Sequence, residues 1–151
     1  MFSNFFRNIL FKVTVNASSS IIHYRSKSDF KVTVMGASGG IGLPLCLQLK
    51  QCPLIEELSI CDILNAHAVG DDIAFMDTKS KVTSYSYPGE ANKAFTNARV
   101  VVMVAGVTRK PPMSREDLFK INAPIVMGVA ENCVKYCPEV WTGFQVQYET
   151  F

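Results

Sequence analysis

A glycine-rich segment lies between a short strand pattern and an apolar helical pattern, and it restricts the possible folds more than any other feature. Residues 31–35 are rich in β-branched side chains, which predicts a strand, and residues 41–51 follow with apolar side chains at helical spacing. Between the two patterns stand Gly36, Ala37, Ser38, Gly39, Gly40, Ile41 and Gly42. In this pattern Gly36 allows a tight turn, Gly39 lets the backbone approach a pyrophosphate, and Gly42 lets the helix pack close to the strand. The sequence therefore predicts a loop that binds phosphates at a helix N-terminus.

The rest of the chain alternates strand and helix patterns. Further strands are expected at 58–61, 81–86 and 99–104, and helices at 66–76, 90–96 and 116–137. Several of these strands are continuously apolar, which is typical of a parallel sheet covered on both faces. We therefore expect an α/β fold with a doubly wound parallel sheet of about four strands, the Rossmann NAD-binding fold, here truncated.

The long helical pattern at 116–137 has a recognisable start and one irregularity. Ser114 can cap the helix, and Asp117 follows three residues later, close to a capping box. Pro124 inside the pattern predicts a kink or a new helix start.

Asp62 stands at the end of the second strand pattern, twenty positions after Gly42. A carboxylate at this place accepts hydrogen bonds from the ribose hydroxyls of a dinucleotide and repels a 2′-phosphate. The cofactor predicted is therefore NAD in preference to NADP. The alternative is a structural glycine turn followed by a solvated aspartate.

Charge and cysteine usage limit the other classes of function. The net charge is +2, but four of the fifteen basic residues precede Asp29, and the other eleven face all thirteen acidic residues. This balance indicates no basic patch for nucleic acid. No apolar run approaches the roughly 20 residues of a membrane-spanning helix. The five cysteines form no Cys-x-x-Cys pair, so no metal site is expected and the thiols are predicted to pack in the core.

The first 28 residues carry basic side chains, no acidic ones, several serines and an amphipathic stripe. This composition is typical of a mitochondrial transit peptide and predicts a location in the mitochondrial matrix. A disordered N-terminus is the alternative, and a secretory signal fits less well because Lys12 interrupts the apolar run.

Four stretches together resemble the malate dehydrogenase family, in particular its mitochondrial type. They cover residues 36–42, 104–111, 113–119 and 122–126, and the loop Arg-Lys-Pro…Met-x-Arg-x-Asp-Leu-Phe is the most specific of them. The resemblance extends over residues 31 to about 140. It implies hydride transfer between malate or oxaloacetate and NAD in the tricarboxylic acid cycle, and a homodimer as the assembly.

The same resemblance implies roles for particular residues. Arg109 and Arg115 match the two loop arginines that grip the dicarboxylate, and two guanidinium forks on one loop suit two carboxylates. Gly106 matches a residue beside the cofactor, and Asn122 one that hydrogen-bonds near the nicotinamide half. Pro112 stands where the family usually has glycine.

The last residues depart from the family. Residues 141–151 alternate apolar and polar side chains, which is typical of an exposed or edge strand, and we interpret them as a divergent tail behind an incomplete NAD-binding domain at 29–140. The family's Asp-x-x-Arg and catalytic histidine have no counterpart in these 151 residues. Neither His23 nor His67 occupies a suitable place, so no catalytic residue is assigned and this chain alone is expected to be inactive.

Two other hypotheses remain beside the dehydrogenase. One is a non-enzymatic NAD-binding remnant, or a partner of full-length subunits. The other is a short-chain dehydrogenase or epimerase, which the sequence disfavours because no tyrosine has a lysine four residues later.

Overall fold

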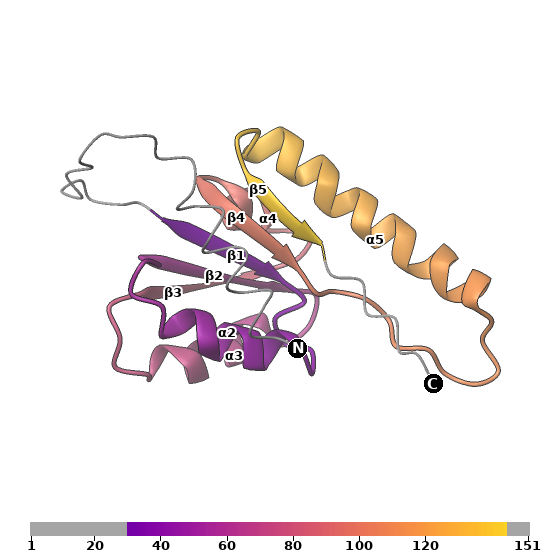
Figure 1. Cartoon of the computed structure of the whole chain (residues 1–151), viewed down its shortest axis with the longest axis horizontal. Helices are drawn as coiled ribbons and strands as arrows, with labels where there is room; N and C mark the ends of the chain where they lie inside the picture. The colour runs from indigo at the N-terminus through magenta and orange to yellow at the C-terminus, as the bar shows by residue number, and fades with distance from the viewer. Residues whose placement is uncertain (1–29, 145–151) are drawn as a thin grey trace, which may run out of the picture.

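The computed structural model describes residues 30–144, so the expected transit peptide lies outside the described residues. Strands and helices alternate along this part of the chain (Figure 1). The elements are β1 (Lys31–Met35), α2 (Gly42–Lys50), β2 (Glu57–Asp62), α3 (Ala66–Ala74), β3 (Lys81–Ser86), α4 (Ala91–Phe95), β4 (Ala98–Met103), α5 (Arg115–Tyr136) and β5 (Trp141–Phe144).

The strands form one parallel sheet in the order β3-β2-β1-β4-β5. β1 lies in the middle and all five of its residues are buried, as expected for a strand covered on both faces. The strand order reverses between β1 and β4, and ligands of doubly wound sheets bind at the carboxyl ends of the strands beside such a reversal. The predicted fold class is confirmed.

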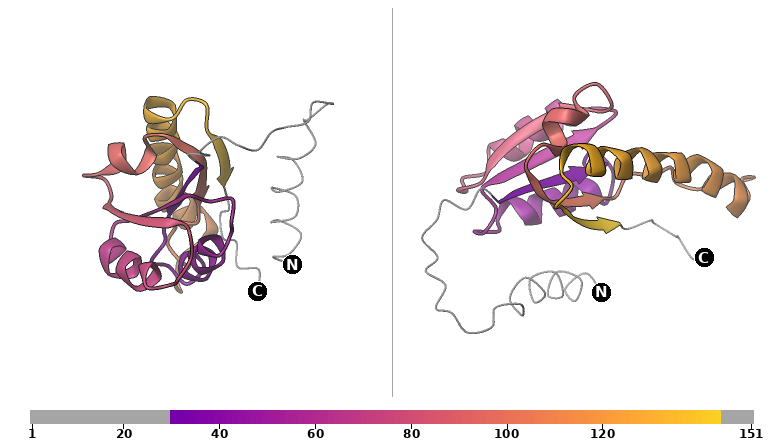
Figure 2. Two further views of the ribbon diagram at one scale, coloured as in Figure 1. Left: turned by 90° about the vertical axis from the view of Figure 1, so that its left-hand side faces the viewer. Right: turned by 90° about the horizontal axis from the view of Figure 1, so that it is seen from above.

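Helices cover both faces of the sheet. The cluster around Val32 and Val34 includes residues of α2 and α3, whereas the cluster around Met35 includes residues of α4 and α5. Figures 1 and 2 show the two helix layers on opposite sides of the strands. Side chains alternate between the two faces of a strand, so one short apolar strand contributes to both clusters. Four of the five cysteines are buried among these side chains as free thiols, as the sequence predicts.

The number of strands differs from the expectation of four. Residues Trp141–Phe144, at the start of the expected divergent tail, pair in parallel with Val100–Met103 of β4. Among residues 30–144 this strand stands at the edge of the sheet, which is the position that its alternating pattern suggests. Without β5, β4 would be the edge strand and would leave a row of backbone N–H and C=O groups unpaired. An extended segment that follows along the chain can pair with these groups, and β5 does so.

Helix α5 is one continuous helix from Arg115 to Tyr136, so of the two alternatives expected at Pro124 the new helix start is wrong. Its first turn has the expected capping box: the Asp117 N–H donates to Ser114 Oγ (3.1 Å) and the Ser114 N–H donates to Asp117 Oδ2 (3.0 Å). Pro124 lies on the exposed side, where the carbonyl that loses its intrahelical donor can bond to water. Buried Val129 and Cys133 hold the second half of the helix on the sheet.

Candidate functional site

The glycine loop begins with a turn that only glycine allows. Gly36 follows β1 with a φ of +84°, in the left-handed region. A Cβ on Gly36 would lie 2.5 Å from the backbone N and Cα of Ala105, so the loop packs directly against the second residue after β4. The Gly36 N–H donates to the carbonyl of Cys61 (2.9 Å), which also ties the loop to β2.

The other glycines of the loop have different environments. A Cβ on Gly42 would lie 2.0 Å from the Gly36 carbonyl oxygen, so Gly42 permits the close packing of α2 that the sequence predicts. A Cβ on Gly39 would also face that oxygen, at 3.3 Å, whereas one on Gly40 would meet nothing within 4 Å. The backbone therefore has more open space around it at Gly40 than at Gly39. The spacing of the glycines had predicted the open position at Gly39.

The N-terminus of α2 is free to bind an anion. Its N-cap residue, Ile41, makes no side-chain capping bond, and the first turn holds no acidic residue. Helix N-termini carry unpaired N–H groups and a partial positive charge, which together attract phosphate. The exposed Gly39 and Gly40 precede this end of the helix, and neither carries a Cβ that would cover the backbone there.

Asp62 lies beside the glycine loop, because β1 and β2 are neighbours and end at the same edge of the sheet. Its Oδ2 accepts the Ser38 N–H at 2.8 Å and its Oδ1 accepts the Leu64 N–H at 3.2 Å. Both oxygens are thus held by backbone donors, and the negative charge is fixed close to where the loop would bind a phosphate-linked ribose.

Gly106 and Asn122 meet at the carboxyl end of β4. Asn122 lies on the inner side of α5 and is only 8% exposed. Its Oδ1 accepts the Val107 N–H at 2.8 Å, and its Nδ2 donates to the Val107 carbonyl at 3.4 Å. The amide therefore clamps the start of the following loop, a contact that the sequence alone did not suggest.

Arg109 and Arg115 lie on the exposed segment between β4 and the first turn of α5. The Nε of Arg109 donates to the carbonyl of Met113 at 2.9 Å, and the Met113 N–H donates to the carbonyl of Lys110 at 2.8 Å. These bonds are local to residues 109–113, within the segment that leaves the carboxyl end of β4. Contacts in the structure join the glycine loop with Asp62, and Gly106 with Asn122, whereas the bonds of Arg109 stay within its own exposed segment.

His67 is the one histidine among residues 30–144, and it belongs to a different segment from the arginine-bearing loop after β4. His67 lies in the first turn of α3, and its Nε2 is 3.7 Å from Glu90 Oε2. The described residues contain no group of three or more His, Cys, Asp and Glu side chains placed to hold a metal ion. No helix in that part of the chain is long and apolar enough to cross a membrane.

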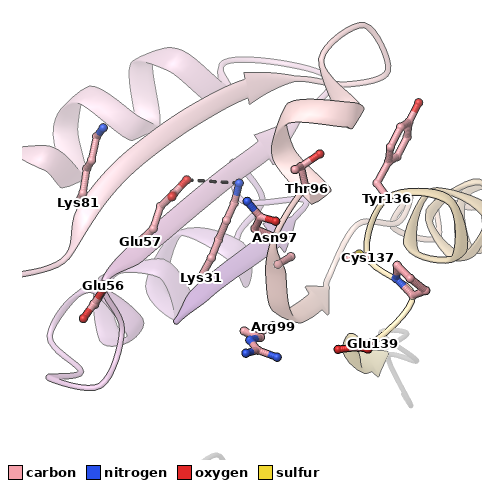
Figure 3. Close-up of a pocket in the computed structure, with 12 residues that line it drawn as sticks. Lys31, Glu56, Glu57, Lys81, Thr96, Asn97, Arg99, Tyr136, Cys137 and Glu139 are labelled. Atoms are coloured by element: carbon pink, nitrogen blue, oxygen red, sulfur yellow. Dashed lines mark ion pairs between the residues drawn. The ribbon is translucent and has the colours of Figure 1, made fainter. Parts of the chain in front are cut away.

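A hollow of about 880 Å³ lies at the opposite end of the sheet, at the amino ends of the strands (Figure 3). Charges of both signs line it, and the buried Lys31 Nζ is 3.3 Å from Glu57 Oε1 and donates to the Lys93 carbonyl at 2.9 Å. Lys31 already has protein partners, and none of the predicted site residues lines this hollow. We therefore place the candidate site at the glycine loop.

A parallel sheet with a glycine loop after its central strand and an aspartate after the neighbouring strand defines a dinucleotide-binding Rossmann domain. Residues 30–143 match the family model described as "lactate/malate dehydrogenase, NAD binding domain". The chain belongs to this NAD-binding family.

The comparisons with known proteins agree with this assignment. "Malate dehydrogenase 1, mitochondrial" of Arabidopsis thaliana is 40% identical over 137 residues, which are 88% of this chain and 40% of the relative. The mitochondrial malate dehydrogenase of Schistosoma mansoni is 47% identical over 103 residues, or 68% and 72% of the two chains. The crystal structure of Cryptosporidium parvum malate dehydrogenase superposes with a TM-score of 0.61 and 33% identity, over 76% of this chain and 37% of that one. This chain thus spans about two fifths of the Arabidopsis relative.

Proposed function

We propose that this chain is the NAD-binding part of an NAD-dependent malate dehydrogenase. The observation that carries the proposal is the carboxylate of Asp62, fixed against the glycine loop by the N–H groups of Ser38 and Leu64. An anionic acceptor at this place suits the ribose hydroxyls of NAD and disfavours the 2′-phosphate of NADP.

The residues present fit the parts of the cofactor. Residues 39–41 and the N-terminus of α2 would hold the pyrophosphate, and Asp62 would hold the adenosine ribose. Gly106 and Asn122 would lie on the side of the nicotinamide half. The bound nicotinamide would supply the hydride acceptor or donor, and the protein would orient it.

Arg109 and Arg115 support a dicarboxylate such as malate or oxaloacetate as the substrate. A guanidinium group binds a carboxylate through two parallel hydrogen bonds, so two arginines on one exposed loop match two carboxylates. The Nε of Arg109 donates to the Met113 carbonyl, and its side chain is otherwise on an exposed segment six residues before Arg115. Closure of this loop over a substrate would exclude water from the site.

A titration with both cofactors tests the proposed NAD site. We expect the 151-residue chain to bind NADH at least about 10-fold more tightly than NADPH, a difference of about 1.4 kcal/mol. Asp62→Ala should reduce this preference, whereas Asp71→Ala, at an exposed aspartate of α3, should retain it. Equal affinities for the two cofactors in the unmodified chain would contradict the proposal.

A non-enzymatic NAD-binding role, or association with full-length subunits, is the second candidate for a polypeptide of these 151 residues. It is favoured because hydride transfer to a ketone needs a proton donor within hydrogen-bond reach. His67 lies in the first turn of α3, five residues after Asp62 on the side of the proposed ribose site, and its Nε2 is beside Glu90 Oε2. We expect no oxidation of NADH by oxaloacetate at 340 nm when the chain is purified from a host without malate dehydrogenase. Turnover near 10 s⁻¹, about the median for enzymes, would reject this candidate.

Localisation and organisation complete the proposal. Matched relatives carry both mitochondrial and glyoxysomal names, and the acid-free basic leader at 1–28 favours the mitochondrial matrix. The NAD-binding domain would occupy residues 29–140, with the 141–151 tail contributing β5 at the sheet edge. A homodimer is the proposed assembly of the complete enzyme, by resemblance to its family.

A further inference from the structure

Ser38 connects the glycine loop to the turn that carries Asp62. Its N–H donates to Asp62 Oδ2 at 2.8 Å, and its hydroxyl donates to the Leu64 carbonyl, also at 2.8 Å. The Leu64 N–H in turn donates to Asp62 Oδ1 at 3.2 Å. These three bonds form a closed ring between two loops that are 24 to 26 residues apart in the sequence.

The turn after Asp62 is held at its ends by main-chain bonds, from the Tyr87 N–H to the Asp62 carbonyl at 2.9 Å and from the Val69 N–H to the Asn65 carbonyl at 3.0 Å. Between these ends it has few buried side chains. The side chains of Ile63 and Leu64 are 69% and 67% exposed, so the turn buries little apolar surface. Asn65, the N-cap residue of α3, has a φ of +55° and makes no side-chain capping bond. A segment with few buried contacts opens locally at low cost in free energy, so each remaining hydrogen bond contributes strongly to its position.

We propose that Ser38 is a positioning residue for cofactor selectivity, which rests on the proposed NAD site at Asp62. Its hydroxyl holds the 63–65 turn against the glycine loop, and this contact keeps the Asp62 carboxylate at the place where it accepts from the ribose. The glycine loop and the acidic residue thereby form one unit. The Ser38 N–H holds only Asp62 Oδ2, and the donor to Oδ1, the Leu64 N–H, belongs to the turn itself. The bond from the Ser38 hydroxyl to the Leu64 carbonyl ties this second donor to the glycine loop.

A double-mutant cycle on NADH affinity tests this coupling in the 151-residue chain. Ser38→Ala removes the hydroxyl donor and keeps the N–H, and we expect it to raise the Kd for NADH about 3- to 10-fold, as for the loss of one hydrogen bond. The Kd for NADPH should not rise, because a displaced carboxylate repels the 2′-phosphate less. In an Asp62→Ala background, Ser38→Ala should change the Kd for NADH by less than about 2-fold, since a residue acting through Asp62 has nothing left to position.

Two control variants separate positioning from a general loss of structure. Ser38→Thr keeps a hydroxyl donor and should restore most of the NADH affinity and of the preference over NADPH. Ser86→Ala, at an exposed serine that ends the adjacent strand β3, should leave both Kd values unchanged. The far-UV circular dichroism and thermal midpoint of each variant should match those of the unmodified chain.

The outcomes distinguish this inference from the proposed function. An unmodified chain that does not prefer NADH would reject both. An unmodified chain that prefers NADH, with a Ser38→Ala variant of equal preference, would reject only the role of Ser38. Equal losses caused by Ser38→Ala with and without Asp62 would also reject that role, because they would show an effect on the phosphate loop that does not pass through the carboxylate.

Discussion

Replacing Gly42 with alanine tests the packing of the glycine loop. The new Cβ would lie 2.0 Å from the carbonyl oxygen of Gly36, 2.7 Å from Ala37 Cα and 2.9 Å from Ala37 C. All three are backbone atoms of a buried turn, so no flexible side chain can move aside. Either α2 shifts away from β1 or the turn at Gly36 distorts, and each response disturbs the cluster in which Cys46 and Leu49 of α2 pack.

The expected loss follows from this geometry. Overpacking a well-packed site costs about 1–3 kcal/mol, and a contact at 2.0 Å with fixed backbone belongs at the upper end. In a chain of about 150 residues each kcal/mol lowers the thermal midpoint by about 2–4 °C. Gly42→Ala should therefore lower the midpoint by about 6–12 °C.

Gly40→Ala is the matched control, because it adds the same methyl group to the same loop. A Cβ there meets nothing within 4 Å. Its thermal midpoint should be unchanged or slightly raised, since alanine lowers the entropy of the unfolded chain. Its NADH affinity should nevertheless fall, because the methyl group stands on the open backbone where the pyrophosphate would approach.

Thermal unfolding followed by circular dichroism measures the first effect, and fluorescence titration with NADH measures the second. Recovery of Gly42→Ala only as aggregate, beside soluble Gly40→Ala, would agree with the same reasoning. Equal midpoints for the two variants would refute it, because they would show that α2 does not rest on the Gly36 turn as closely as the structure indicates.

Three further predictions concern the core, the long helix and the leader. Burial raises the pKa of Cys46 and Cys61 from 9.0 to about 12, so between these pH values the folded state keeps protons that the unfolded chain releases. The urea midpoint of unfolding should therefore fall as the pH rises from 9 towards 12. The fall should be less steep in Cys46→Ala, which has lost one of the two thiols. A midpoint independent of pH over this range would contradict the burial of these thiols. Ser114→Ala removes the capping box of α5 and should cost about 1 kcal/mol in urea unfolding, whereas Ser86→Ala should cost almost nothing. Residues 1–27 fused to a fluorescent reporter should direct it to mitochondria, and replacing their basic residues with glutamate should leave it cytosolic, whereas secretion of the unmodified fusion would disprove the assignment.

The sequence alone determined the features that depend on neighbouring residues. The β-branched run at 31–35 and the spacing of Gly36, Gly39 and Gly42 were sufficient to predict a strand, a turn and a helix in the correct order. The capping box at Ser114 was equally predictable, because its partner lies three residues away. Such patterns are readable because backbone geometry and side-chain spacing act within one or two turns of chain.

The packing of distant segments was decided only by the tertiary structure. Asp62 was predictable as an acidic residue after a strand, but the ring that joins it to Ser38 links loops 24 residues apart. The clamp of Asn122 on Val107 likewise depends on how α5 crosses the end of β4.

Gly40 and β5 show the same limit. The spacing pointed to Gly39 as the open glycine, yet the path of the turn leaves more room at Gly40. The alternating pattern at 141–144 indicated an edge strand but not its partner, and the segment pairs with β4 through backbone groups that every residue carries. Sequence patterns record which local conformation a segment prefers. Which two segments touch depends on the entropy and packing of the whole chain, and no short pattern contains that information.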